Sequence, residues 1–144
     1  KIKKTDNVLH IGGLTGYLSS IISKLCNKLV IIEKDENILL DLNNNLNKYN
    51  IKNTTVIKSD FDEGYSLKAP YDLVIIDCPI YNLKKKLIEQ LNPNYGRIIY
   101  IEKIKNDLSK GYRLTMSNNS FIKEYLFDVF SNFSIDQAES NFEF

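Results

Sequence analysis

The strongest constraint on the fold comes from residues 8–17, VLHIGGLTGY. The first four residues of this stretch have the composition of a short buried strand, and Gly12, Gly13 and Gly16 predict a tight turn after it. We expect a helix to begin near Thr15, whose hydroxyl is a candidate cap. A glycine-rich turn between a strand and a helix lets the backbone approach a ligand closely and directs unpaired helix N–H groups toward it.

Matching strand and helix patterns follow along the chain. The expected strands are residues 29–32, 54–58, 72–77, 97–101, 112–116 and 121–127, and the expected helices are residues 15–26, 36–49 and 83–91. The last two strands are joined by Ser117-Asn118-Asn119-Ser120, which is typical of a hairpin turn. This alternation predicts an α/β fold with a Rossmann-like, doubly wound, mostly parallel seven-stranded sheet and a C-terminal antiparallel hairpin. We expect one domain over residues 1–144.

The helices are expected to be amphipathic. Leu18, Ile21, Ile22 and Leu25 recur at the spacing of one apolar helix stripe. In the next helix the stripe is made by leucines and isoleucines, and the asparagines are expected to face away from it. These asparagines are Asn43, Asn44, Asn45 and Asn47. Because asparagine is a poor helix former, packing has to stabilise this helix.

The composition limits which cellular compartments and which binding partners are expected. The formal net charge of +1 gives no overall attraction to nucleic acid or to an anionic membrane, and no apolar run reaches spanning length. Cys26 and Cys78 lack metal-ligand spacing, so we expect no bound metal, no disulfide framework and a cytoplasmic protein. Because the chain starts at Lys1 and enters its first strand at once, we expect it to be a piece of a longer polypeptide. The sequence does not define an oligomeric state.

Three loops are expected to meet at the carboxyl edge of the sheet, where folds of this kind bind ligands. The glycine turn follows the first strand, and Glu33 ends the second, where a carboxylate accepts hydrogen bonds from both ribose hydroxyls. Asp60 and Phe61 follow the third strand and supply an acceptor for an exocyclic amine and an aromatic edge for a purine. Together these features indicate an adenosine-containing ligand.

The spacing of the glycines limits which adenosine ligand fits. A G-x-G-x-x-G fingerprint counted from Gly12 would need glycines at Leu14 and Tyr17, and counted from Gly13 it would need them at Thr15 and Leu18. No P-loop run is present either. S-adenosylmethionine, which carries no phosphates, remains as the common ligand of this architecture.

Four stretches of the sequence together resemble the protein-L-isoaspartate O-methyltransferases. They are VLHIGGLTGY, VIIEKDENI, NTTVIKSDFDEGYSLKAPYDLVIID and LIEQLNPNYGRIIYIE. The similarity covers about residues 7–100, and the tail ending at residues 141–144 matches more loosely. The resemblance implies a methyltransferase fold that binds S-adenosylmethionine and transfers a methyl group to the α-carboxylate of damaged aspartyl residues in proteins or peptides.

The resemblance also implies a set of cofactor contacts. Its members are His10, Gly12, Gly13, Gly16, Glu33, Lys34, Asp60, Phe61 and Asp77. Two positions depart from the family: an acidic residue is usual where this chain has His10, and a glycine is usual where it has Leu14. A leucine there is expected to crowd the methionine part of the ligand, and the missing acid removes a partner for its ammonium group. The family's substrate-contacting residues lie upstream of the glycine turn.

Each of these residues also has a simpler interpretation. The glycines can form only a tight strand–helix joint, and Glu33 can be a solvated strand end. Asp60 can be plain surface and Phe61 plain core. His10, the single histidine, is expected to be a hydrogen-bonded core or site-lining residue rather than an acid–base catalyst.

Three functions remain open from the sequence. The first is a carboxyl methyltransferase, which needs no general base because its acceptor carboxylate is already ionised; no catalytic residue can be named. The second is a non-catalytic interaction module that has lost cofactor binding. The third is an amino methyltransferase, indicated only by the weak motif DCPIY at residues 77–81.

Overall fold

The computed structural model describes residues 1–105, 107–118 and 120–134. Seven strands form one sheet in the order β3-β2-β1-β4-β5-β6-β7. Their bounds are β1 Asn7–Ile11, β2 Lys28–Glu33, β3 Thr54–Lys58, β4 Leu73–Ile80, β5 Arg97–Lys105, β6 Leu108–Ser117 and β7 Ser120–Phe130. The pairs from β3 to β5 are parallel, whereas β5–β6 and β6–β7 are antiparallel. The predicted fold class and C-terminal hairpin are therefore confirmed.

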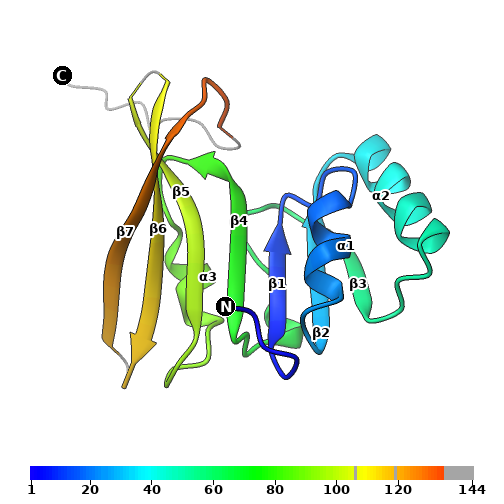
Figure 1. Ribbon diagram of the computed structural model, residues 1–144, viewed down its shortest axis with the longest axis horizontal. Helices are drawn as coiled ribbons and strands as arrows, with labels where there is room; N and C mark the ends of the chain where they lie inside the picture. Colours follow the sequence, from blue (N-terminus) through cyan, green and yellow to red (C-terminus); the bar gives the residue numbers. More distant parts are fainter. Residues whose placement is uncertain (106, 119, 135–144) are drawn as a thin grey trace.

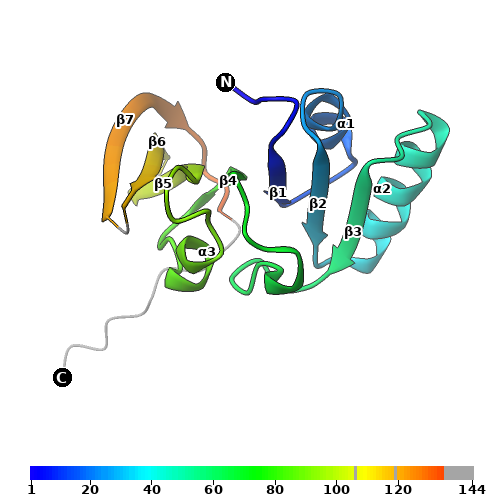
Figure 2. The same cartoon turned by 90° about the horizontal axis from the view of Figure 1, so that it is seen from below.

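The helices cover the parallel part of this sheet on both faces, as a doubly wound fold requires. They are α1 Tyr17–Ser23, α2 Glu36–Lys48 and α3 Lys85–Glu89, with the 3-10 turn η1 at Ser66–Lys68. Ile22 of α1 and Leu42 of α2 pack on one face, and Leu87 of α3 packs on the other. Figures 1 and 2 show that the three helices lie over or beside β1–β5, whereas β6 and β7 extend away from them.

The alternation of buried side chains explains why the strands form in this register. Val8 and Ile31 belong to the core on the α1–α2 side, whereas Leu9 and Ile32 belong to the core on the α3 side. All four residues have 0% of their surface accessible to solvent. A strand that is apolar on both faces is typical of the interior of a parallel sheet, so β1 and β2 lie at its centre.

Several local predictions were wrong at element boundaries. Helix α1 ends at Ser23, so Leu25 lies beyond it and remains 44% exposed instead of continuing the apolar stripe. Its N-cap is Gly16 without a side-chain hydrogen bond, and therefore Thr15 does not cap the helix. Helix α3 spans only Lys85–Glu89, because the chain at Leu91 pairs as an isolated bridge with Tyr71.

The C-terminal strands are longer than their sequence patterns indicated. Strand β6 begins at Leu108 rather than at Tyr112, and β7 continues to Phe130. Ser117 pairs with Ser120 across the predicted turn, in which Asn119 lies outside the described residues. The loosely matching tail at residues 141–144 also lies outside them. No helix in the described part of the chain is long and apolar enough to cross a membrane.

Candidate functional site

The glycine turn lies at the point where the strand order reverses, because β1 is flanked by β2 on one side and β4 on the other. The amides of Gly12 and Gly13 donate to the carbonyl oxygen of Ile32 at 3.0 and 3.2 Å, which fixes the turn against β2. Gly12 has φ +80° and Gly16 has φ +87°, a region that side chains other than glycine rarely adopt. The turn therefore exists because of its glycines, and it lies where folds of this kind bind ligands.

The glycines of the turn face different surroundings. A Cβ on Gly13 would lie 2.4 Å from Cγ2 of Ile31, and one on Gly16 would lie 2.8 Å from Cδ1 of Leu42. Both of these neighbours are core side chains, so Gly13 and Gly16 are required for close packing. Gly12 instead faces the Asp77 carboxylate and the Cys78 thiol, with nearest distances of 3.8 and 3.7 Å from its ideal Cβ position.

Glu33 is buried at the end of β2, with 2% of its surface exposed. Its Oε2 accepts a hydrogen bond from the amide of Leu14 at 3.1 Å. Its Oε1 accepts from the amides of Lys34 and Asp35 at 2.9 and 3.2 Å. The interpretation of Glu33 as a solvated strand end is therefore wrong: its carboxylate connects β2, the glycine turn and the start of α2.

Leu14 adopts the left-handed conformation, with φ +45°. This conformation is costly for a leucine, and it explains why a glycine suits this position. The Leu14 side chain is 45% exposed and lines a hollow beside the turn. The leucine narrows this hollow without filling it.

This hollow at the carboxyl edge has a volume of about 290 Å³ and brings together four loops. It is lined by Gly12, Leu14, Glu33, Lys34, Asp35, Ile38, Phe61, Cys78, Phe133 and Ser134. Four predicted site residues are thus gathered, namely Gly12, Glu33, Lys34 and Phe61. The ammonium group of Lys34 lies 5.0 Å from the centroid of the Phe61 ring, and this ring also packs against the core. Phe61 therefore both lines the hollow and packs against the core.

The other predicted residues lie around the hollow rather than in its lining. Asp60 is exposed on the loop after β3. His10 has no accessible surface and lies behind the turn, where its Nδ1 is 2.8 Å from the Ser19 hydroxyl. Its Nε2 is 3.6 Å from Oδ1 of Asp77 and has no hydrogen-bond partner. His10 is thus the hydrogen-bonded core residue expected, and any contact with a ligand remains a prediction.

Asp77 and Cys78 occupy an irregular part of β4. The strand does not end at Asp77, as the sequence pattern indicated, but continues to Ile80 with a register shift against β5 between Ile76 and Pro79. Such bulges redirect side chains beside functional sites. The Asp77 side chain keeps 27% exposure, and the Cys78 thiol lies 3.7 Å from its Oδ1. Burial, followed by the nearby Asp77 charge, raises the pKa of Cys78 to about 12, so this thiol is not a nucleophile at neutral pH.

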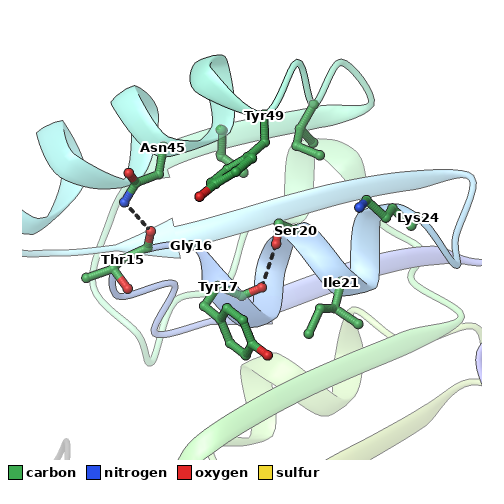
Figure 3. Close-up of a pocket in the computed structure, with 10 residues that line it drawn as sticks. Thr15, Gly16, Tyr17, Ser20, Ile21, Lys24, Asn45 and Tyr49 are labelled. Carbon is green, nitrogen blue, oxygen red and sulfur yellow. Dashed lines mark hydrogen bonds between the residues drawn. The ribbon is translucent and has the colours of Figure 1, made fainter.

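A second and larger hollow of about 430 Å³ lies between α1 and α2. Figure 3 shows Tyr17 and Ile21 on its α1 side and Asn45 and Tyr49 on its α2 side. Of the residues predicted to bind the ligand, its lining includes Gly16 but none of the acidic or aromatic ones. The smaller hollow is therefore the candidate ligand site, because it lies at the switch point of the sheet and contains Glu33 and Phe61.

Asn45 corrects one sequence expectation in this region. Its side-chain amide donates to the carbonyl oxygen of Thr15 at 2.8 Å, as Figure 3 shows. This asparagine therefore does not face away from the fold but connects α2 to the glycine turn. The signal that could have indicated this role is the accumulation of asparagines in a helix that packs over a loop with unpaired carbonyl groups.

The comparisons with known proteins identify the family. The sequence model of the protein-L-isoaspartate(D-aspartate) O-methyltransferases matches residues 1–129. The chain belongs to this family. A protein-L-isoaspartate O-methyltransferase of Pyrococcus abyssi is 34% identical over 100 residues, which cover 69% of this chain and 46% of the relative. The chain thus spans about half the length of the curated methyltransferases that it matches.

Solved structures agree with this family at the level of the fold. A protein-L-isoaspartate O-methyltransferase superimposes with a TM-score of 0.83 at 21% identity, covering 92% of this chain and 43% of that one. A putative methyltransferase from Streptococcus mutans in complex with SAH gives a TM-score of 0.57 at 19% identity, covering 69% of this chain and 64% of that one. These similarities confirm the methyltransferase fold predicted from the sequence.

Sequence reasoning missed several residues of the hollow. Cys78 is not among the predicted cofactor contacts, yet it lines the hollow through the β4 bulge. Asp35 caps α2 by accepting from the amides of Asn37 and Ile38, and it also borders the hollow. Phe133 comes from beyond the last strand, and nothing in the local sequence pattern indicates its position.

Proposed function

We propose that the hollow at the carboxyl edge binds S-adenosylmethionine, as part of a protein carboxyl methyltransferase that acts on isoaspartyl residues in proteins or peptides. The observation that carries this proposal is the buried Glu33 carboxylate, which holds the glycine turn against a hollow lined by Phe61. Family membership and the names of the relatives support the activity. The proposed cofactor contacts are His10, Gly12, Gly13, Gly16, Glu33, Lys34, Asp60, Phe61 and Asp77.

The carboxylates at the hollow suit a cationic nucleoside, and the Lys34 ammonium in the lining lies 5.0 Å from the Phe61 ring centroid. Glu33 lies in its lining, and the partly exposed Asp77 lies beside Gly12. Carboxylates accept hydrogen bonds from hydroxyl and ammonium groups and repel phosphate. Within the described residues, no cluster of His, Cys, Asp or Glu suited to a metal ion is found. The Glu33 and Asp77 carboxylates are acceptors that fit a sulfonium nucleoside with an amino acid tail.

The hydrogen bonds of Glu33 limit what it can offer to the ribose. A carboxylate has about four acceptor positions, and three are used by the amides of Leu14, Lys34 and Asp35. One position on Oε2 remains. We therefore expect Glu33 to accept from one ribose hydroxyl, rather than from both as a free carboxylate would. Asp77, next to the glycine turn, is the proposed partner of the ammonium group.

The reaction makes modest demands on the protein. S-adenosylmethionine supplies an electrophilic methyl group when it is bound. The acceptor carboxylate is ionised at neutral pH, so no side chain of this chain has to remove a proton. The contribution of the hollow is to fix the nucleoside by Glu33 and Phe61 and to limit the approach of water.

Calorimetry with S-adenosylhomocysteine tests the cofactor assignment. We expect the folded protein to bind at sub-millimolar concentration. Glu33→Gln is expected to weaken binding about 10-fold, because the hydrogen bond to the ribose loses its charge and the loop amides lose one of the two acceptor oxygens. Glu36→Gln is the matched control, since Glu36 is exposed and forms an ion pair with exposed Lys58. Absence of heat with the folded wild-type protein would contradict the assignment and favour a non-catalytic interaction module.

A methyl-transfer assay separates the carboxyl from the amino methyltransferase. Labelled methyl groups on an isoaspartyl peptide are expected to be released by mild alkali, because methyl esters hydrolyse there and methylamines do not. Label that survives this treatment would favour the amino methyltransferase indicated by residues 77–81.

The expected surroundings of the protein follow from its composition. The cysteines Cys26 and Cys78 are both free, which supports a reducing compartment such as the cytoplasm. The formal net charge of +1 gives no overall attraction to nucleic acid or to an anionic membrane surface, and the proposed partner is an isoaspartyl protein or peptide.

A further inference from the structure

The segment after β7 returns to the carboxyl edge of the sheet. Figure 1 shows it in red, turning from the end of β7 toward the upper end of β4. The amide of Ser131 donates to the carbonyl oxygen of Asp107 at 2.7 Å, and the ammonium group of Lys103 donates to the carbonyl oxygen of Ser131. Lys103 is only 5% exposed, so this contact is made by a buried charge rather than by a surface side chain.

These anchors place Phe133 at the hollow. The amide of Phe133 donates to the Ser131 hydroxyl at 3.1 Å, which closes a short turn at residues 131–133. Phe133 then lines the same hollow as Gly12, Glu33 and Phe61. It lies there because β6 and β7 form a hairpin that carries the chain back to this edge.

Phe133 retains 57% exposure although it lines a hollow. A large apolar ring that is half exposed beside a concave surface has area available for burial against a ligand. Phe61, the aromatic residue predicted from the sequence, already has the Lys34 ammonium 5.0 Å from its ring centroid. One face of the Phe61 ring is therefore used, whereas a base in the hollow can bury the Phe133 ring.

We propose that Phe133 is a cofactor-binding residue whose ring stacks on the adenine of the ligand. This inference rests on the proposed function and adds a contact from a segment outside the parallel part of the sheet. Stacking of a base on an aromatic side chain contributes about 1–3 kcal/mol by alanine substitution. Through Phe133, the position of the C-terminal hairpin contributes to the affinity for the cofactor.

Substitution of the ring tests its contribution. Phe133→Ala is expected to raise the Kd for S-adenosylhomocysteine about 5- to 150-fold, and Phe133→Tyr is expected to keep the wild-type Kd because stacking is retained. The same loss is expected for 5′-methylthioadenosine, which keeps the adenine and lacks the amino acid tail. Phe121→Ala is the matched control, since Phe121 is also about half exposed (55%) but lies at the far end of β7.

Fluorescence gives an independent readout, because the chain contains no tryptophan. Phe133→Trp places a single tryptophan in the hollow. Its emission, excited at wavelengths where the nine tyrosines do not absorb, is expected to change as S-adenosylhomocysteine is added. Phe121→Trp is expected to show no change. Far-UV circular dichroism establishes that each variant is folded, which is expected because both positions are exposed.

The outcomes separate this inference from the cofactor assignment. If the wild-type protein releases no heat with S-adenosylhomocysteine, the cofactor assignment fails and the role of Phe133 fails with it. If the wild-type protein binds and Phe133→Ala binds equally well, only the role of Phe133 is overturned. Tighter binding by Phe133→Ala also overturns it, because the ring would then occupy the space of the ligand.

Discussion

The two halves of the sheet are built in different ways. From β3 to β4 the strands are parallel, are packed against α1, α2 and α3, and contain side chains such as Leu9 and Ile31 with no accessible surface. From β6 to β7 the strands are antiparallel, and β7 has no buried residue among those described. The parallel half is therefore stabilised by apolar burial on both faces. In the antiparallel half, β6 adds a few buried residues such as Leu114, whereas β7 depends on its backbone ladder and on surface contacts.

The surface contacts of the antiparallel half are aromatic and ionic. Tyr112 lies between Tyr100 and Tyr125, with ring centroids 5.8 and 6.2 Å apart. The ammonium group of Lys123 lies 4.0 Å from the Tyr112 centroid and 2.8 Å from Oε2 of Glu102. Tyr100 is buried, but the Tyr125 ring and the ion pair of Lys123 and Glu102 remain in contact with water, so these contacts contribute less than apolar burial. The two halves are expected to respond very differently to the same substitution.

Removal of one isoleucine side chain from each half gives the largest expected contrast. Ile31 has no accessible surface, and Ile31→Ala is expected to lower the free energy of unfolding by about 4 kcal/mol. Ile122 is 67% exposed, so Ile122→Ala is expected to change this free energy by less than about 0.5 kcal/mol. Urea unfolding followed by circular dichroism measures both. Similar losses in the two variants would show that the exposed face of β7 is covered in solution.

Ion pairs sharpen the same comparison. The Asp6 carboxylate in the parallel half lies 2.7 Å from Nη2 of Arg97, and both side chains are largely buried. Asp6→Ala leaves the largely buried Arg97 charge without its carboxylate partner, with hydrogen bonds only to carbonyl oxygens, and is expected to cost about 3 kcal/mol. The exposed pair of Arg113 and Glu124 is the control, and Glu124→Ala is expected to cost about 0.5 kcal/mol or less. Equal costs in urea unfolding would contradict the difference in burial.

Alkaline pH is expected to destabilise the parallel half through Cys78. Its pKa is raised by burial, and next by the Asp77 charge, from 9.0 to about 12. The unfolded chain therefore loses this proton first, and the stability that is present below pH 9 falls as the pH rises toward 12. Cys78→Ala is expected to recover about 1 kcal/mol of the loss at pH 10. An unchanged pH profile in this variant would show that Cys78 titrates normally.

The conformation of Leu14 leads to the smallest expected effect. Leu14→Gly removes the cost of φ +45° but increases the entropy of the unfolded chain, so stability is expected to rise by about 0.5 kcal/mol. Leu14→Ala keeps the backbone cost and removes only the bulk of the side chain. If both variants bind S-adenosylhomocysteine more tightly, the leucine crowds the hollow. If neither variant binds more tightly, crowding is excluded as the reason for any weak binding.

The parallel half could be predicted from sequence, because its signals are local and periodic. Continuous apolar runs such as residues 29–32 indicate strands buried on both faces, and the glycine turn fixes the first strand–helix joint. Strand β3 was predicted with its observed bounds, Thr54–Lys58. The boundaries of α1 and α3 could not be predicted in this way, because tertiary contacts end these helices before their apolar patterns do.

Only part of the site could be predicted from the sequence, because tertiary contacts place some of its residues. Gly12, Glu33 and Phe61 follow strands of known polarity, so their meeting at one edge follows from topology. The side-chain directions depend on features that no local pattern carries. The register shift in β4 sets the place of Cys78, and the β6–β7 hairpin sets the place of Phe133.

The hydrogen bonds of Glu33 have a consequence for how the site can change. One carboxylate organises the glycine turn and is also the proposed receptor for the ribose, so the loop is already ordered before a ligand arrives. The entropy of ordering is then lost during folding rather than during association, which favours a preformed receptor. A substitution at Glu33 therefore alters both the conformation of the loop and its binding of the nucleoside. Substitutions that change the ligand without disordering the loop are therefore expected at Leu14 or Phe133 rather than at this carboxylate.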